Sequence, residues 1–216
     1  MALTKVIGDG IGNITGASLN DAKTIQFGSS QDSDIAHYSD GQLALRNTDS
    51  QGITFYSGST PTEHMRIDAT GAVTKPLQPA FQAKPGAAQN NMAVGSEVTI
   101  VLGTEIFDNN ADFASNSFTA PVTGKYRFDV SLRLGAVDQA SEYYLTRLNT
   151  SNRNHDMIFD SNENSNGDLD YVAFTFSVLT DMDANDTATL KFFQNSGTAQ
   201  TDVDQTNTRL SGNLVC

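Results

Sequence analysis

The chain has 216 residues, of which 18% are charged and 38% hydrophobic, and its formal net charge is −12 at pH 7. Carboxylates outnumber basic side chains by 25 to 13, so the chain as a whole repels nucleic acid and a general nucleic-acid-binding function is excluded. The one cysteine, Cys216, has no partner for an intrachain disulfide.

The N-terminal residues, MALTKVIGDGIGNITG, contain no basic region followed by an apolar run, so we expect no signal peptide. No stretch of the sequence approaches the ~20 apolar residues of a membrane span. We therefore expect a protein that is made in a cytoplasm and does not insert into a membrane.

Short strands, each ended by a turn, are predicted before Pro76. They lie in the runs TIQFGSS, IAHYSDGQLALRN, GITFYSG and HMRIDATGAVTK. The Asp40-Gly41 pair predicts a hairpin, because an Asp-Gly turn suits the right-handed twist of paired strands. Large apolar residues are few in residues 1–78, so one copy buries too little surface to offset chain entropy. We expect copies of the same chain, or a larger assembly, to hold this segment.

A domain boundary is predicted at Pro76-Leu77-Gln78-Pro79, because two prolines in four residues favour an extended linker. The expected division is a fibre-like segment of short β-hairpins at residues 1–78 and a second domain at 79–216.

Longer strands with strict alternation follow the linker. Tyr126, Phe128 and Val130 fall on one side of the strand that begins near Gly124, and charged residues such as Arg127 fall on the other. Similar runs recur to the C-terminus with turn signals between them, and no helical period competes with them. The pattern predicts an all-β sandwich of about ten strands.

The order of these elements resembles the trimeric globular heads of the first complement component and its relatives, which share the tumour-necrosis-factor-like jelly roll. The most specific match is FTAPVTGKYRF, which contains the signature residues Phe118, Pro121, Gly124, Tyr126 and Phe128. PAFQAK, IFDNNADF, LTDMDANDTATLKF and TRLSGNLV also match, with Leu210 in place of the family's Phe. The resemblance covers Pro79 to Cys216 and implies a homotrimeric jelly-roll head.

Family members pack three sandwiches around an axis through an aromatic, apolar face. The resemblance makes Tyr143, Tyr171 and Phe193 candidates for that face. The alternative for each of them is an ordinary half-buried strand residue.

The N-terminal segment resembles a different group of proteins. TEHMRIDATGAVTK is similar to the Glu-Arg-Met-Arg-Ile-Asp-x-x-Gly-x-Val motif of many bacteriophage tail fibres, with His64 in place of the usual Arg. The residues that follow the motif do not resemble the self-cleaving chaperone domain that often follows it, and the sequence contains no collagen repeats like those of vertebrate complement relatives. The combination favours a phage virion protein.

Catalytic chemistry is not predicted. His37, His64 and His155 are scattered, no nucleophile-elbow pattern is present, and surface histidines are the favoured interpretation. No zinc pattern or phosphate loop is present, so we expect no cofactor and no enzyme activity.

Calcium is the one metal ion for which the sequence offers candidate ligands. Oxygen-bearing residues in DSNENSNGDLD suggest it, namely Asp160, Asn162, Asn164 and Asp168. Gly167 comes late and the terminal bidentate Glu is missing, so the pattern favours a solvated turn.

We therefore expect a virion fibre protein, a homotrimer that is assembled in the host cytoplasm. Its N-terminal segment would attach to other virion proteins, and its head would bind a glycan or protein of the host-cell surface. The alternative is a capsid or tail decoration protein with no receptor role. A polysaccharide-degrading tailspike is disfavoured, because the chain lacks the long repetitive scaffold that such enzymes use for paired carboxylates.

Overall fold

The computed structural model describes residues 23–27, 33–38, 40–48 and 51–216. The chain divides into two compact units, residues 1–76 and 77–216. The division falls two residues before the expected boundary. Leu77 and Gln78 belong to the second unit because their carbonyl oxygens accept hydrogen bonds from the side chains of Asn110 and Asn109, at 2.9 and 3.2 Å.

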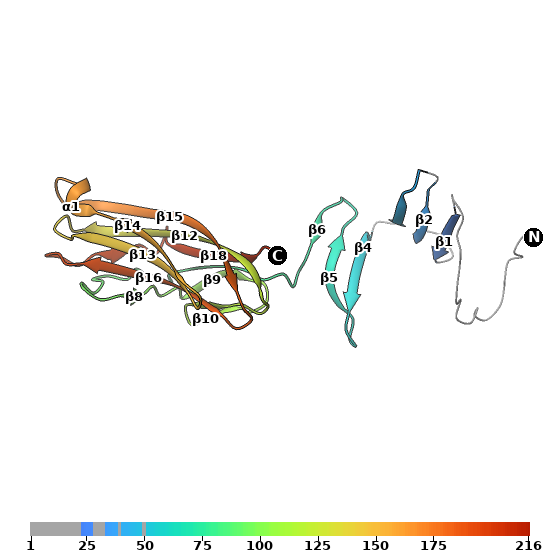
Figure 1. The fold of residues 1–216 in the computed structure, drawn as a ribbon, viewed down its shortest axis with the longest axis horizontal. Helices are drawn as coiled ribbons and strands as arrows, with labels where there is room; N and C mark the ends of the chain where they lie inside the picture. The colour runs from blue at the N-terminus through green and yellow to red at the C-terminus, as the bar shows by residue number, and fades with distance from the viewer. Residues whose placement is uncertain (1–22, 28–32, 39, 49–50) are drawn as a thin grey trace, which may run out of the picture. The chain divides into compact units, whose positions relative to one another are not determined.

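In the described part of the first unit, the strands form two antiparallel three-stranded sheets (Figure 1). The first sheet contains β1 (Lys23–Phe27), β2 (Ser33–His37) and β3 (Leu43–Asn47). The second contains β4 (Ile53–Ser57), β5 (Thr62–Ile67) and β6 (Val73–Thr74).

The hairpin predicted at Asp40-Gly41 is confirmed by the pairing of β2 with β3. Gly41 has φ +88°, and the Gln42 N–H donates to the Asp40 carboxylate at 3.1 Å. Glycine reaches this positive φ at no steric cost, and the Asp side chain satisfies a backbone donor that the turn leaves free.

In the second unit, residues 77–216, which the structure describes in full, twelve strands form two six-stranded antiparallel sheets. Sheet I has the order β15-β12-β18-β7-β9, with β17 paired to β12. Its strands are β15 (Leu169–Met182), β12 (Gly124–Val137), β18 (Arg209–Leu214), β7 (Ala80–Lys84), β9 (Thr104–Asp108) and β17 (Asp202–Val203).

Sheet II has the order β10-β11-β16-β13-β14, with β8 paired to β16. Its strands are β10 (Phe113–Ala114), β11 (Ser117–Thr119), β16 (Thr187–Asn195), β13 (Tyr143–Thr150), β14 (Asn154–Phe159) and β8 (Val98–Thr99). The two sheets stack as a sandwich (Figure 1). The chain crosses between them from β12 to β13, from β14 to β15, from β15 to β16 and from β16 to β17, as in a jelly roll. The predicted all-β jelly roll is confirmed.

The core lies between the sheets and consists of the apolar side of each alternating strand. Tyr126, Phe128 and Leu132 of β12 are fully buried. The Phe128 ring contacts those of Phe81 and Phe118, and the Tyr126 ring contacts that of Phe118. The Phe81 and Phe118 rings stack with their centroids 4.9 Å apart. Burying aromatic and branched side chains on one face of each sheet is the main term that stabilises such a sandwich.

The segment before β12 fixes where that strand starts. The Ala120 N–H donates to the Asp186 carbonyl at 2.8 Å, and the Asn185 N–H donates to the Ala120 carbonyl at 2.7 Å. A Cβ at Gly124 would lie 2.7 Å from Leu214 Cδ1 and 2.8 Å from the Cys216 carbonyl oxygen, so the C-terminal residues require glycine here. This part of the signature is therefore a packing junction.

One short helix, α1 (Ser161–Asn164), lies in the Asn-rich loop after β14, where the sequence predicted only a turn. Asp160 is its N-cap and accepts a hydrogen bond from the Glu163 N–H at 3.0 Å. Asp is a favoured N-cap because its carboxylate satisfies a free helix N–H.

Candidate functional site

The motif that resembles phage fibres builds the β5–β6 hairpin. The Asp68 carboxylate accepts hydrogen bonds from the Thr70 hydroxyl and from the Thr70 and Ala72 N–H groups, at 2.7 to 2.9 Å. These donors, the Thr70 hydroxyl first, hold the pKa of Asp68 below its ordinary value. Gly52 packs so closely under this turn that a Cβ there would lie 2.2 Å from the Ile67 carbonyl oxygen. The motif is thus a rigid structural hairpin.

Apolar side chains of the first unit are mostly outside. Among its residues with described burial, the buried ones are Asp34 and Ala36. The exposed large apolar residues are Tyr38, Leu43, Leu45, Phe55, Tyr56 and Val73. One Asp34 carboxylate oxygen bonds to Arg46 at 2.5 Å, while the other is buried with no hydrogen-bond partner. This distribution is inverted relative to a domain that is stable alone.

The outer face of sheet I carries both charged and apolar side chains around an open hollow. Arg127 and Asp129 form a salt bridge of 2.9 Å, and the Ser177 hydroxyl donates to the same carboxylate. Leu179, 61% exposed, and Val215 lie beside this pair around an open hollow of about 710 Å³. Exposed apolar side chains therefore lie beside an ion pair on this face.

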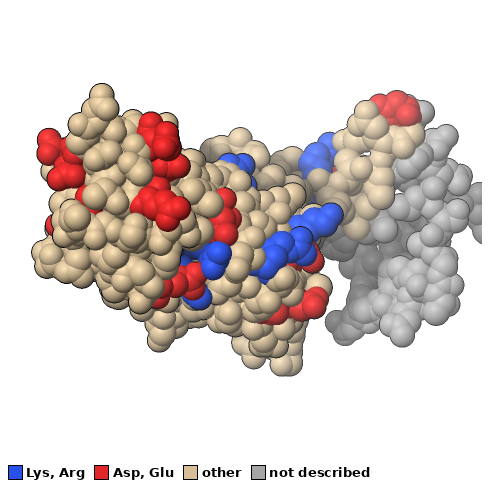
Figure 2. Space-filling view, turned by 60° about the vertical axis from the view of Figure 1, so that its left-hand side comes forward, with Lys and Arg blue, Asp and Glu red and all other residues tan. Residues whose placement is uncertain are grey.

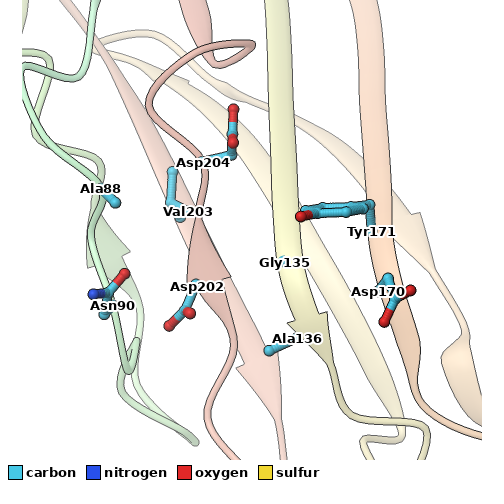
Figure 3. A pocket seen from close by; sticks show the side chains of 9 residues that line it. All are labelled: Ala88, Asn90, Gly135, Ala136, Asp170, Tyr171, Asp202, Val203 and Asp204. Carbon is cyan, nitrogen blue, oxygen red and sulfur yellow. The ribbon is translucent and has the colours of Figure 1, made fainter.

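A second hollow, of about 520 Å³, lies at the end of sheet I (Figure 3). Asp170, Asp202 and Asp204 line it, and the Tyr171 ring reaches from β15 toward Gly135 of β12. Two of the carboxylates serve the backbone: Asp202 accepts from the Asn91 N–H at 2.7 Å, and Asp204 accepts from two N–H groups of the following turn. Their first role is therefore to shape loops.

Sheet II presents a row of ion pairs on its outer face. The Arg147 guanidinium donates to Asp156 at 2.7 and 2.8 Å and to Glu97 at 2.6 Å. Lys191 donates to the other Glu97 oxygen at 2.8 Å. The row is assembled from β13, β14, β16 and the loop before β8, and its four formal charges cancel.

The ion pairs stabilise the charged forms of Glu97, Arg147 and Asp156. The hydrogen bond from Lys191 is the largest influence that holds the pKa of Glu97 below its ordinary value. Arg147 does the same for Asp156, and Asp156 in turn raises the pKa of Arg147. Glu97, Asp156 and Arg147 therefore remain ionised around neutral pH.

An aromatic pair adjoins this row. The ring centroids of Tyr143 and Phe193 are 5.9 Å apart with the planes tilted by 37°. Together with Leu145, Arg147 and Glu97 they line an open hollow of about 260 Å³. Sequence reasoning singled out both aromatic residues but missed Glu97, Arg147, Asp156 and Lys191, which lie up to 94 positions apart.

The three interface candidates do not share one face. Tyr143 and Phe193 lie together on the outer face of sheet II, whereas Tyr171, 60% exposed, lies on the outer face of sheet I. The expected aromatic face is therefore divided between two sheets. The assignment of each residue to a subunit interface stays a prediction.

The calcium candidates have other partners in the structure. Asp160 caps α1, and the Asn164 side-chain amide donates to the Asp160 carbonyl at 2.7 Å. The Asp168 carboxylate accepts from the Gln139 N–H at 3.0 Å, and the Asn162 side-chain oxygen lies 3.5 Å from the Gln139 amide. In the part of the chain that the structure describes, no group of three His, Cys, Asp or Glu side chains is placed to hold a metal ion.

The histidines occupy three different environments. His64 Nε2 lies 2.8 Å from the Ser57 hydroxyl on an exposed hairpin, and the side chain of His37 lies outside the described residues. His155 differs from the expected surface position, because its Nε2 is buried with no hydrogen-bond partner. Burial, followed by the charge of Arg153, lowers the pKa of His155.

No protein-family model matches the chain, and no curated protein matches it. Three solved structures that resemble it are the globular domain of zebrafish complement 1qA protein, murine APRIL and the PRD1 vertex protein P5. Their sequence identities are 16%, 10% and 9%, and their TM-scores are 0.47, 0.47 and 0.42. Each match covers 64% of this chain and 98%, 99% and 98% of the other. The strand order and register, rather than these low similarities, establish the jelly roll.

Charged side chains are interspersed over the surface. Figure 2 shows carboxylates and basic groups scattered among uncharged residues on one face of the molecule. Among the residues described, no helix is long and apolar enough to cross a membrane.

Proposed function

We propose that this chain is a homotrimeric structural protein of a bacteriophage virion, in which the first unit attaches to the particle and the jelly roll contacts the host surface. The observation that carries the proposal is the inverted burial in the first unit. The resemblance of residues 62–75 to a phage-fibre motif supports the virion, and the resemblance of the head to trimeric jelly rolls supports three copies.

The first unit needs partners for a physical reason. Leu43, Leu45 and Phe55 expose much of their apolar surface to water. Burying this surface would stabilise the folded protein by about 25 cal/mol for every Å² removed from water. Short sheets from three chains, wound around a common axis, would cover these side chains. A trimeric fibre of this kind would bury apolar side chains that a single copy leaves exposed.

In the head, the outer face of sheet I is the proposed contact between copies. Arg127 and Asp129 form an ion pair with no net charge. Leu179 and Val215 are exposed, and removing them from water would contribute favourable free energy to association. Tyr171 belongs to this face. Tyr143 and Phe193, on the other sheet, then remain at the outside of the assembly.

Light scattering of the purified chain tests the oligomer. We expect three times the chain mass of 23.2 kDa. Leu43→Lys should raise the protein concentration at which smaller species appear, because a charge would enter the proposed interface of the first unit while the contact between the heads remains. Ser59→Lys adds the same charge at an exposed loop position and should leave the trimer intact. A stable monomer, or equal behaviour of the two variants, would refute the trimeric fibre.

Two fragments test which unit does what. Residues 77–216 keep the hydrogen bonds of Leu77 and Gln78 to the head and should fold without the first unit. This head should adsorb to host cells and compete with infection by intact phage. Fragment 1–76 should bind particles that lack the protein and should ignore the cells.

The competing role is decoration of the capsid or tail without receptor binding. A folded head that neither adsorbs to cells nor slows infection would support decoration and refute attachment. Immunogold imaging of the virion supplies the location independently. Because the chain carries a net charge of −12, adsorption to an acidic envelope should weaken little as salt rises.

A further inference from the structure

We propose that the hollow on the outer face of sheet II binds one uncharged hexopyranose unit of a glycan. Glu97, Tyr143, Leu145, Arg147 and Phe193 line this hollow. The inference rests on the proposed attachment function and names the chemistry and the place of the contact.

The aromatic part of the hollow suits the apolar face of a sugar ring. Tyr143 and Phe193 come from neighbouring strands, and Leu145, 8% exposed, lies directly opposite Phe193 in the sheet. Their rings are half-buried, so they are fixed by packing and still present surface to solvent. A pyranose carries a patch of C–H groups that covers such a ring, and covering it removes apolar area from water.

The polar part of the hollow suits hydroxyl groups. Arg147 is held by three hydrogen bonds to Asp156 and Glu97, so its orientation is set before a ligand arrives. An ionised carboxylate has about four acceptor sites. Arg147 and Lys191 each fill part of the capacity of Glu97, and acceptor capacity remains. Hydroxyls both donate and accept, so they match a rim of carboxylate oxygens and N–H groups.

Charge balance selects an uncharged ligand. Glu97 and Asp156 are cancelled by Arg147 and Lys191, which leaves the hollow with no net charge in a chain of net charge −12. A phosphate or uronate would meet the two carboxylates, and an ammonium would meet the two bases. A neutral polyhydroxyl compound is repelled neither by the carboxylates nor by the basic groups.

The size of the hollow fits a single sugar unit. Its volume of about 260 Å³ is below the ~300–1,000 Å³ of clefts for drug-sized ligands. A one-unit contact is weak by itself, and repetition in three copies would raise the avidity of the assembly for a repeating glycan.

Tyr171, the exposed aromatic residue of sheet I, is a poorer platform. The Arg133 guanidinium lies 4.0 Å from the centroid of its ring. The ring also packs against Gly135, where a Cβ would lie 3.6 Å from Tyr171 Cε1. Arg133 therefore covers one face of the ring, and the hollow that Tyr171 lines carries three carboxylates, whereas the charges beside the Tyr143–Phe193 pair cancel.

The test is saturation-transfer NMR and calorimetry on the full chain. The probes are the methyl glycosides of glucose, galactose, mannose and N-acetylglucosamine, with methyl glucuronide as the anionic comparison. Phe193→Ala should weaken the neutral probe that binds best by at least about tenfold. Ile158→Ala removes an exposed apolar side chain from the same sheet face outside the hollow and should leave binding unchanged.

Glu97→Gln supplies a second readout with nearly unchanged shape. It leaves the row with one excess positive charge, so methyl glucuronide should gain affinity relative to the neutral probes. Preference for methyl glucuronide in the unmodified chain, or equal losses in Phe193→Ala and Ile158→Ala, would overturn the proposal.

Adsorption of the same proteins to host cells distinguishes the proposed saccharide site from the proposed attachment function. If the chain adsorbs to cells but none of the glycosides binds, the saccharide site is refuted and the attachment function stands. If a glycoside binds in a Phe193-dependent way but the chain does not adsorb, the site stands and the attachment function is refuted.

Discussion

Phe128 and Gly212 lie opposite each other on β12 and β18, and their contact offers a quantitative test of the sandwich core. Phe128 is fully buried, with its ring centroid 5.6 Å from that of Phe118 and 6.3 Å from that of Phe81. Phe128→Ala removes the ring from this cluster. We expect the free energy of unfolding to fall by about 3–5 kcal/mol, from lost apolar burial and the cavity that remains.

Gly212→Ala perturbs the same place in the opposite sense. A Cβ at Gly212 would lie 2.7 Å from Phe128 Cδ1 and 2.8 Å from Phe81 Cε1, and both rings are fully buried. Overpacking of this kind costs about 1–3 kcal/mol. In the double variant the new methyl group enters the space that Phe128 vacated. The combined loss should therefore be smaller than the sum by about 1 kcal/mol or more.

The assay is urea unfolding followed by far-UV circular dichroism, because the chain contains no Trp. All variants are compared at one subunit concentration, since assembly adds to apparent stability. Lys125→Ala is the matched control: Lys125 is on the same strand but is exposed, and its replacement should lower stability much less than Phe128→Ala. Equal losses for these two variants would refute the assignment of strand faces, and additive losses in the double variant would refute the Phe128–Gly212 contact.

Three further predictions concern titration and the α1 loop. Burial lowers the pKa of His155 below its ordinary 6.5, so the unfolded state binds more protons and stability should fall as pH drops below about 6.5; His155→Leu should flatten this loss in thermal melts across pH. Burial is the largest single influence on the pKa of Asp138 and raises it, but hydrogen bonds from the N–H groups of Ala199, Ala140 and Thr198 together hold the pKa below 3.8. The stability that Asp138 contributes is therefore present above about pH 4 and lost as pH falls further, and Asp138→Asn should lower the melting temperature at pH 7 and reduce the acid dependence. Asp160→Ala should lower the free energy of unfolding by about 1 kcal/mol through loss of the α1 cap. Neither calcium nor a chelator should shift the melting temperature of the unmodified chain. A calcium-dependent rise in melting temperature that Asp160→Ala abolishes would instead establish a metal site.

Local patterns in the sequence were enough to predict much of the fold. Alternation with period two placed Tyr126, Phe128 and Val130 on the core side of β12, because successive side chains of a strand point to opposite faces. The Asp40-Gly41 turn was equally local, since two residues supply the φ angle and the side-chain acceptor that the hairpin needs. The α1 turn was missed because four residues carry too little periodicity to distinguish a helix from a polar loop.

The candidate site depended on long-range pairing. The resemblance made Tyr143, Tyr171 and Phe193 candidates for one aromatic face, but the alternation of side chains along a strand does not specify which of the two sheets each strand joins. That choice follows from strand order: β13 pairs with β16, which brings Tyr143 to Phe193, while β15 pairs with β12 and carries Tyr171 to the other side of the sandwich. The same pairing aligns Arg147 with Lys191 and with Asp156, and a loop adds Glu97 from 50 residues away. A charged residue on a strand is an ordinary solvated side chain until its cross-strand neighbours are known, so the neutral row beside the aromatic pair exists only in the tertiary structure.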